Sequence, residues 1–180
     1  KDGLPNNNII AIHESKDKKL WVAASSGGIA LYDGKRFSSV DVTGNVTTIQ
    51  SDAEGSLWLG TQRQGAARYK INSSGSTTNL KIQDRYNQSQ LGHRHIGTIS
   101  HHSDNSIWFG TRGGGATSYD GTSFSTINDQ NGLPHNWVRT IAKGINNSIW
   151  VGTENGAILY ENNRIVKTIQ TKDGLVNNWV

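Results

Sequence analysis

Side chains that can bind an anion or a sugar recur at loop positions of this sequence. Arginine presents a planar fork of N–H donors that suits carboxylates and sulfates. Asparagine supplies both a donor and an acceptor, and exposed tryptophan gives a flat apolar platform. We therefore expect a ligand-binding site where such loops converge. The candidates are Arg63, Arg112 and Glu154 from one set of loops, and His93, Arg94, His95, His135, Asn136 and Trp137 from another.

The elements that must position these residues are four copies of one sequence repeat. Each copy contains a tryptophan anchor, and the anchors are 37, 50 and 42 residues apart. An isoleucine precedes each anchor by nine residues, and a tyrosine follows it by ten or eleven. Self-similarity of this kind indicates a repeat architecture. The anchors are Trp21, Trp58, Trp108 and Trp150, and the isoleucines are Ile12, Ile49, Ile99 and Ile141.

Short runs rich in β-branched and aromatic residues predict four strands in each copy. Glycine, asparagine, aspartate and serine separate the runs, and Asp33-Gly34 and Asp120-Gly121 are typical of hairpin turns. Four short strands in a repeat of about 40 residues are the pattern of a β-propeller blade. We therefore predict an all-β chain of four-stranded antiparallel blades. A β-sandwich is the alternative, but it has no reason to repeat these positions in register.

The spacing of the anchors also predicts the organisation of the chain. We expect Trp21, Ile12 and Leu31 to pack between the first blade and its neighbours. The polar stretch 72–79 predicts a flexible tip or a long outer hairpin. Residues 81–95 predict a long linker before the third blade. One segment, residues 1–180, then comprises blades at about 3–42, 43–84, 85–129 and 130–171 and the start of a further repeat at 172–180.

The end of the sequence repeats its beginning, because KDGL occurs at 1–4 and again at 172–175. Propellers have about four to eight blades. We expect these four copies to form an arc with two unpaired blade faces, as an excised piece of a larger propeller or as one completed by self-association. Large exposed apolar patches drive association. A closed ring of four blades is the alternative.

The composition excludes several classes of function. The net charge of +4 is modest and the basic residues are scattered, so we expect no nucleic-acid partner. No run of 18 apolar residues occurs, so we expect no membrane span within the chain. The absence of cysteine excludes disulfides and thiol chemistry.

Two of the copies carry a motif that resembles a known family. The motif begins with Gly-Leu-Pro, continues through an asparagine and a Val or Ile, and ends with Trp-x-Gly-Thr, or its variant, and a tyrosine. It runs from Gly3 to Tyr32 and from Gly132 to Tyr160. This pattern is similar to the two-component regulator propeller repeat. The other copies keep the tryptophan half and replace Gly-Leu-Pro by residues 43–45 and 91–95. The resemblance implies a periplasmic sensor, built as a seven-bladed ring in a parent anchored in the inner membrane.

The same resemblance implies a non-catalytic sensing segment of a bacterial signalling protein, whose output is a histidine kinase or a diguanylate cyclase. For some members it implies oligosaccharide as the ligand. A module that binds only protein is one alternative, and a propeller lyase or hydrolase is another. Catalysis would need paired carboxylates or a nucleophile–base pair near the axis. Glu154 and His135 are the only obvious pair, so we expect no enzyme and no cofactor.

Two further questions remain open from the sequence. Trp137 either offers a platform to a ligand or packs on the next blade, and Trp179 at the equivalent position favours packing. The histidines raise the question of a metal site. His93 and His95 should begin an inner strand that His101 and His102 end, so we expect the two pairs on opposite faces and no metal ion.

Overall fold

The computed structural model describes residues 3–25, 28–74, 77–102 and 105–180. Its strands form four sheets, each antiparallel and ordered as in the chain, so the prediction of four-stranded blades is confirmed. The first sheet comprises β1 (Ile9–Glu14), β2 (Leu20–Ala24), β3 (Gly28–Tyr32) and β4 (Phe37–Val40). The second comprises β5 (Val46–Ser51), β6 (Leu57–Thr61), β7 (Ala66–Ser74) and β8 (Thr77–Tyr86).

The third sheet comprises β9 (Ile96–His101), β10 (Ile107–Thr111), β11 (Ala116–Tyr119) and β12 (Phe124–Ile127). The fourth comprises β13 (Val138–Lys143), β14 (Ile149–Thr153), β15 (Gly156–Glu161) and β16 (Arg164–Ile169). Three single-turn helices lie between or after sheets: α1 (Gln88–Leu91), η1 (Asp129–Asn131) and η2 (Thr171–Asp173). No helix among the described residues is long and apolar enough to cross a membrane.

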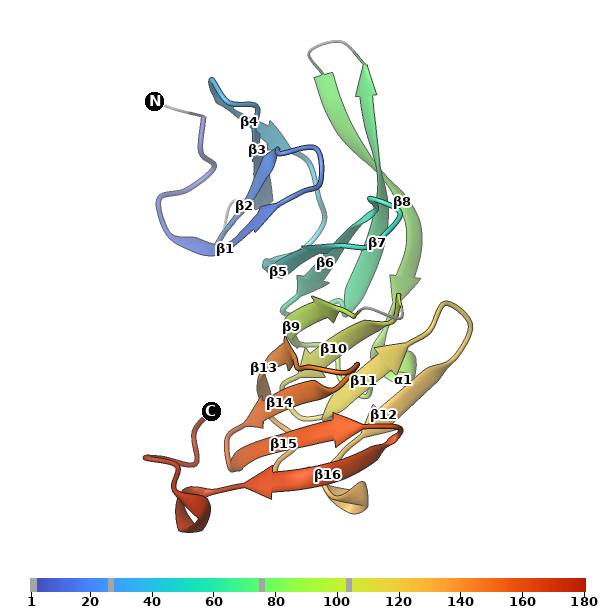
Figure 1. Cartoon of the computed structure of the whole chain (residues 1–180). Helices are drawn as coiled ribbons and strands as arrows, with labels where there is room; N and C mark the ends of the chain where they lie inside the picture. The colour runs from blue at the N-terminus through green and yellow to red at the C-terminus, as the bar shows by residue number, and fades with distance from the viewer. Residues whose placement is uncertain (1–2, 26–27, 75–76, 103–104) are drawn as a thin grey trace.

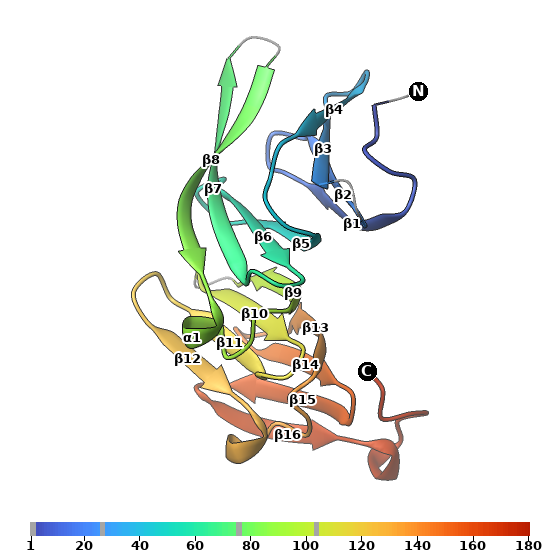
Figure 2. The same ribbon diagram turned by 180° about the vertical axis from the view of Figure 1, so that it is seen from behind.

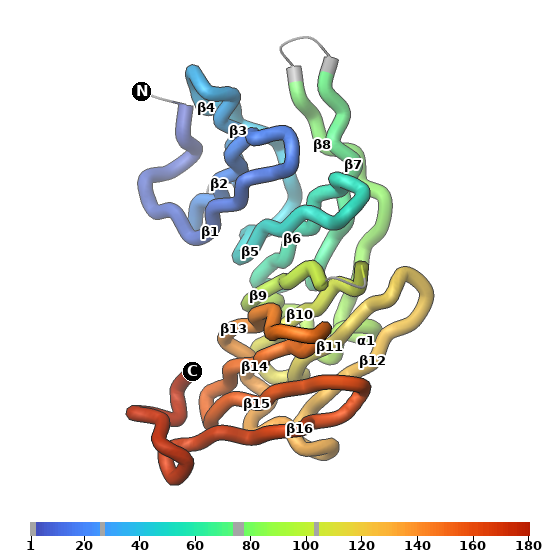
Figure 3. The backbone as a smooth tube through the Cα atoms, in the orientation of Figure 1, coloured from blue at the N-terminus to red at the C-terminus, as the bar shows by residue number. Residues whose placement is uncertain are grey.

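The sheets follow one another along an open arc (Figure 1). The strands β1, β5, β9 and β13 lie next to one another along the inside of the arc. Both ribbon views show the first and fourth sheets apart, so the four sheets do not close into a ring (Figures 1 and 2). The tube in Figure 3 shows the long hairpin of β7 and β8 projecting beyond the rest of the second sheet.

Three hydrophobic cores, one between each pair of adjacent sheets, hold the arc together. In each core the tryptophan of one sheet lies with the isoleucine of the next sheet. All six side chains are nearly fully buried, and burying an aliphatic side chain of this size stabilises the fold by about 1.5–3 kcal/mol. The pairs are Trp21 with Ile49, Trp58 with Ile99 and Trp108 with Ile141.

The expectation that Ile12 packs between blades is wrong. Its side chain is 65% exposed, whereas Ile49 at the equivalent position is 5% exposed. Ile12 pairs with Val22 and the adjacent His13 pairs with Trp21, so Ile12 lies on the opposite face of the first sheet from Trp21. No other sheet covers that face in the part of the chain described. Trp21 and Leu31 are buried toward the second sheet, as expected.

The linker expected at residues 81–95 is also shorter than predicted, because β8 continues to Tyr86. Residue 84, taken as the end of the second blade, therefore lies inside a strand. The polar stretch 72–79 belongs to the long hairpin, which was one of its two expected forms. Residues 75 and 76 at its tip, and residues 26 and 27 of the expected loop 25–27, lie outside the described part of the chain.

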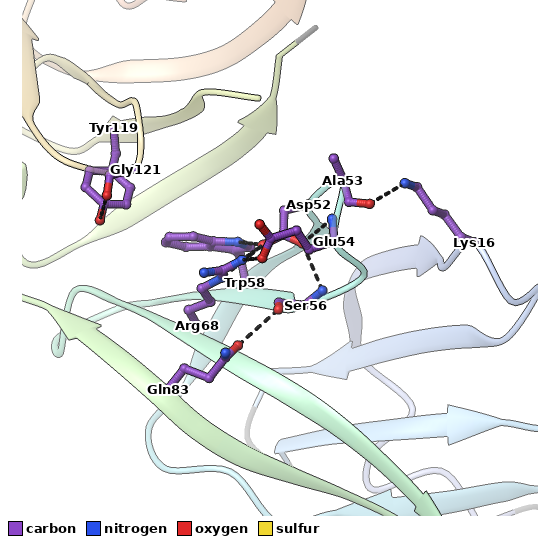
Figure 4. A network of polar contacts seen from close by, with 10 residues as sticks. All are labelled: Lys16, Asp52, Ala53, Glu54, Ser56, Trp58, Arg68, Gln83, Tyr119 and Gly121. Atoms are coloured by element: carbon purple, nitrogen blue, oxygen red, sulfur yellow. Dashed lines mark hydrogen bonds and ion pairs between the residues drawn. The ribbon is translucent and has the colours of Figure 1, made fainter. Parts of the chain in front are cut away.

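A buried carboxylate organises the turn between β5 and β6 (Figure 4). Asp52 accepts hydrogen bonds from the backbone N–H groups of Glu54 at 3.0 Å and Ser56 at 2.9 Å. It also accepts from the indole of Trp58 at 2.9 Å and the guanidinium of Arg68 at 2.7 Å. Burial acts to raise the pKa of Asp52, but the hydrogen bonds from Trp58, Arg68 and Ser56 outweigh it and hold that pKa below its usual value.

Replacing Asp52 by alanine is expected to lower the free energy of unfolding by about 2–4 kcal/mol, because it leaves a buried indole N–H unpaired and removes one of the two carboxylate partners of a mostly buried guanidinium. Urea denaturation measures the change. The control is Glu54→Ala, which removes the exposed partner of Arg68 and should cost at most about 1 kcal/mol. Equal losses in the two variants would show that Asp52 has no special role.

The same substitution at two equivalent isoleucines tests the stacking of the sheets. Ile49→Ala should lower the free energy of unfolding by about 2–4 kcal/mol, since it opens a cavity between the first and second sheets. Ile12→Ala should change it by about 0.5 kcal/mol or less, since its side chain is exposed. A large loss for Ile12→Ala would mean that another surface covers the first sheet.

Candidate functional site

One hydrogen bond recurs in every sheet and joins the two sets of loops. The backbone N–H four residues after each tryptophan anchor donates to the carbonyl of the residue before the innermost strand. The two sets of loops therefore meet at one end of the sheets. The pairs are Ser25 with Asn8 at 2.9 Å, Gln62 with Asn45 at 2.9 Å, Arg112 with His95 at 3.1 Å, and Glu154 with Trp137 at 3.2 Å.

At the third and fourth sheets this end carries alternating arginine and tryptophan side chains. The guanidinium of Arg112 lies 5.6 Å from the centroid of the Trp137 ring. That of Arg139 lies 5.7 Å from the centroid of Trp137 and 4.5 Å from that of Trp179. Cation–π attraction operates at these separations. We call Arg112, Trp137, Arg139 and Trp179 the arginine–tryptophan ladder.

Each member of the ladder comes from a different part of the fold. Arg112 follows β10, and a bridge to Trp137 connects it to the residue before β13. Arg139 is the second residue of β13, and the buried Val138 before it turns Arg139 to the other face of the strand. Trp179 is held near the fourth sheet because the N–H of Val180 donates to the carbonyl of Thr153 at 3.1 Å.

Glu154 forms an ion pair with Arg139 and not with His135, which the sequence had indicated as its partner. The carboxylate is largely buried, with 12% of its side chain exposed, whereas Arg139 is 39% exposed. His135 instead closes its own loop, since its Nδ1 accepts the backbone N–H of Trp137 at 3.0 Å. The only acid–base pair that the sequence offered near the axis is therefore absent.

His93 and Asn136 also have identifiable roles within their loops. The Nδ1 of His93 accepts the backbone N–H of His95 at 3.1 Å, which repeats the contact made by His135. The side-chain oxygen of Asn136 accepts the N–H of Asp129 at 2.8 Å. The carbonyl of Asn136 accepts from Gly113 at 3.1 Å. These atoms hold the loops in shape, which leaves Nε2 of the histidines as their available polar atom.

The remaining candidates lie at various distances from the ladder. His95 is partly buried beside Arg112, and burial, helped by the charges of Arg112 and His93, lowers its pKa. Its imidazole is therefore neutral at neutral pH. Arg63 and Arg94 are exposed, and neither makes a hydrogen bond or ring contact with the ladder in the described part of the chain. The structure thus brings together Arg112, Trp137, Glu154 and His95.

Sequence reasoning missed Arg139 altogether and took Trp179 as a structural residue. Trp179 repeats the position of Trp137, and this repetition was the signal that two aromatic rings would lie near each other. Arg139 carries no repeat signal, because the equivalent strand positions hold other residue types. Its importance depends on contacts between the fourth sheet and the terminal segment.

The histidines on the third sheet do not gather with carboxylates. The Nε2 of the buried His102 lies 3.2 Å from the carbonyl oxygen of Ser148. Burial and the charge of Lys143 lower the pKa of the adjacent His101. Within the described ranges, no three His, Cys, Asp or Glu side chains are placed to hold one metal ion.

Comparison with known proteins agrees with this architecture. The extracellular domain of the putative one component system BT4673 from B. thetaiotaomicron superimposes with a TM-score of 0.77 at 19% identity, over 93% of this chain and 25% of that one. The extracellular domain of the putative hybrid two component system BT3049 from the same organism gives 0.58 at 21% identity, over 97% and 30%. A streptogramin B lyase gives 0.73 at 18% identity, over 97% and 58%.

These likenesses define the class of protein: the fold is that of a β-propeller segment. The chain spans about a quarter of the length of the BT4673 domain. The two-component regulator propeller model matches residues 3–26, 42–63 and 132–155, so the resemblance noted in the sequence is confirmed for these segments. No curated protein matches the sequence.

The lowered pKa of His95 predicts a pH dependence of stability. As the pH falls below 6.5, His95 binds a proton in the unfolded chain before it does so in the folded protein. The contribution of His95 to the free energy of unfolding is therefore fully present above pH 6.5 and is lost as the pH falls toward the lower pKa of the folded state. In His95→Asn, which copies Asn8 and Asn45 at the equivalent positions, urea denaturation between about pH 5 and 7.5 should show a weaker loss. An identical slope in both proteins would contradict the environment described for His95.

Proposed function

We propose that this chain is a non-catalytic, extracytoplasmic sensing segment of a two-component-type signalling protein. The family repeats support a signalling protein, and the extracellular domains that share its fold support a periplasmic location in a parent anchored in the inner membrane. The arginine–tryptophan ladder is the proposed binding site. Its ligand is an oligosaccharide that carries carboxylate or sulfate groups.

Arg112 is the observation that carries this proposal. Its side chain is exposed and makes no ion pair among the described residues, whereas Glu154 partly neutralises the neighbouring Arg139. A carboxylate or sulfate would accept two parallel hydrogen bonds from this guanidinium. Trp179, whose side chain is 66% exposed, offers a ring face against which a sugar would lie. Glu154 holds Arg139 in place, so it positions the site and repels a second anion.

The other residues expected from the sequence are proposed as outer contacts of the same site. They lie in loops at the same end of the sheets, where Nε2 of a histidine or an exposed guanidinium can reach a longer ligand. A chain of several sugar units would be needed to contact them together with the ladder. They are Arg63, His93, Arg94, His95, His135 and Asn136.

Signalling would follow from the open arrangement of the sheets. The ladder joins the third sheet to the fourth and to the segment that follows it. A ligand that binds one arrangement of these parts more tightly shifts the population toward that arrangement, by an amount set by the difference in affinity. We propose that this shift is what the parent protein transmits.

A protein-binding function is the second candidate, and the exposed face of the first sheet favours it. Ile10 and Ile12, at alternate positions of β1, are 43% and 65% exposed. Further blades of a parent protein or a second copy of this chain would cover this surface. Light scattering over a concentration series tests whether a second copy covers this surface. A mass that rises to that of a dimer supports association of copies, and a constant monomer mass opposes it.

Arg112→Ala should weaken binding of an acidic oligosaccharide by about tenfold or more, since a charge-assisted hydrogen bond contributes about 1.5–3 kcal/mol. The probe is an oligogalacturonate, measured by calorimetry beside a neutral galactose oligomer. Arg164→Ala, an exposed arginine on β16, is the matched control and should bind as the unchanged protein does. Arg63→Ala tests the outer contacts. Unchanged affinity in both Arg112→Ala and Arg63→Ala would refute the site.

A further inference from the structure

The third and fourth sheets enclose a second feature at the end opposite the ladder. There, near the hairpin turns of both sheets, lies a groove of about 590 Å³. Sites for small ligands commonly measure about 300–1,000 Å³. The two sheets lie side by side in both ribbon views (Figures 1 and 2). Residues of both sheets line the groove. The feature is therefore large enough to receive a sugar unit or more.

A repeat position that differs between the second and third sheets helps to keep the groove open. In the second sheet Arg68 pairs with Trp58 across β6 and β7, and its long side chain lies over the indole and bonds Asp52 (Figure 4). The cavity left beside it measures about 150 Å³. In the third sheet the equivalent partner of Trp108 is Ser118. A serine leaves open the volume that the arginine fills.

The lining of the groove combines aromatic surface with neutral polar groups. Trp108 and Tyr160 meet edge to face at its base, with ring centroids 5.5 Å apart. Ser118 and Ser125 bring hydroxyl groups from the third sheet. Asn162 and Asn163 bring amides from the turn between β15 and β16, where both have a left-handed backbone with φ of 51° and 60°. Aromatic rings beside amides and hydroxyls suit the apolar faces and hydroxyl groups of a sugar.

The charge of the lining is negative. It contains the carboxylates of Asp120 and Glu161 and neither lysine nor arginine among the residues described there. Asp120 accepts hydrogen bonds from the N–H groups of Thr122 and Ser123, each at 2.8 Å, and from both hydroxyls. It is therefore a fixed anion at the edge of the groove. An acidic ligand would be repelled here, in contrast to the ladder.

We propose that this groove is a second binding site, for a neutral or amino-bearing oligosaccharide. The site does not depend on the ladder, because the two lie at opposite ends of the sheets and only the ladder attracts an acidic ligand. One chain would then contact two kinds of sugar, or two differently charged parts of one polysaccharide. The carboxylates accept hydrogen bonds from sugar hydroxyl or ammonium groups, and the partly exposed ring of Tyr160 receives an apolar sugar face.

The test uses calorimetry with cellohexaose, maltohexaose and a chitosan hexamer as probes, and an oligogalacturonate as the acidic comparison. At least one of the first three should bind. Ser118→Arg, which copies the second sheet, should weaken that binding by about tenfold or more. Glu161→Gln should weaken the chitosan hexamer more than the neutral probes. Ser118→Arg should leave the binding of the oligogalacturonate at the ladder unchanged, which separates this site from the ladder.

Ser125→Trp provides a second way to fill the groove, from an exposed position on β12 that tolerates a larger side chain. It keeps the test valid if Ser118→Arg fails to fold. The proposal is overturned if none of the three probes binds at millimolar concentration, if a folded filling variant binds them as well as the unchanged protein, or if the oligogalacturonate binds there equally well.

Discussion

The packing of a tryptophan on one sheet against an isoleucine on the next is the interaction on which the rest of this structure depends. Each sheet contacts only its neighbours, so stability accumulates interface by interface, as in other repeat proteins. The same rule explains why Ile12 is exposed although Ile49 is buried. It also fixes the site, since Arg112 reaches Trp137 only because Trp108 and Ile141 bring their sheets together.

That single interface between the third and fourth sheets produces two surfaces of opposite character. At one end, loops that begin and end strands place arginines beside tryptophans. At the other, hairpin turns place carboxylates and amides around an aromatic base. The strands between them are filled by buried apolar residues, whereas the residues of the turns and loops differ from one repeat to the next. A change in the angle between the two sheets would therefore affect both surfaces.

The sequence predicted the sheets well because their cores need the same residue type at the same place in every copy. It predicted the site less well, because a repeat position says nothing about which side chains meet across sheets. The ion pair of Glu154 with Arg139 is an example, because only the structure shows that these two side chains meet. The segment between the second and third sheets gives another example. It lacks Gly-Leu-Pro, yet Asn87 and Gln90 form the same reciprocal cap as Asn128 and Asn131. Different residues thus build the same backbone.

The difference between Arg68 and Ser118 shows how repeats of one fold acquire different surfaces. Both residues pair with the anchor tryptophan of their sheet, but neither belongs to the apolar core. In the second sheet the arginine is stabilised by a buried carboxylate, whereas the third sheet has His102 in the place of Asp52. An arginine at 118 would lack that partner, so the two positions depend on each other. The groove is open because the carboxylate and the arginine are both absent from the third repeat.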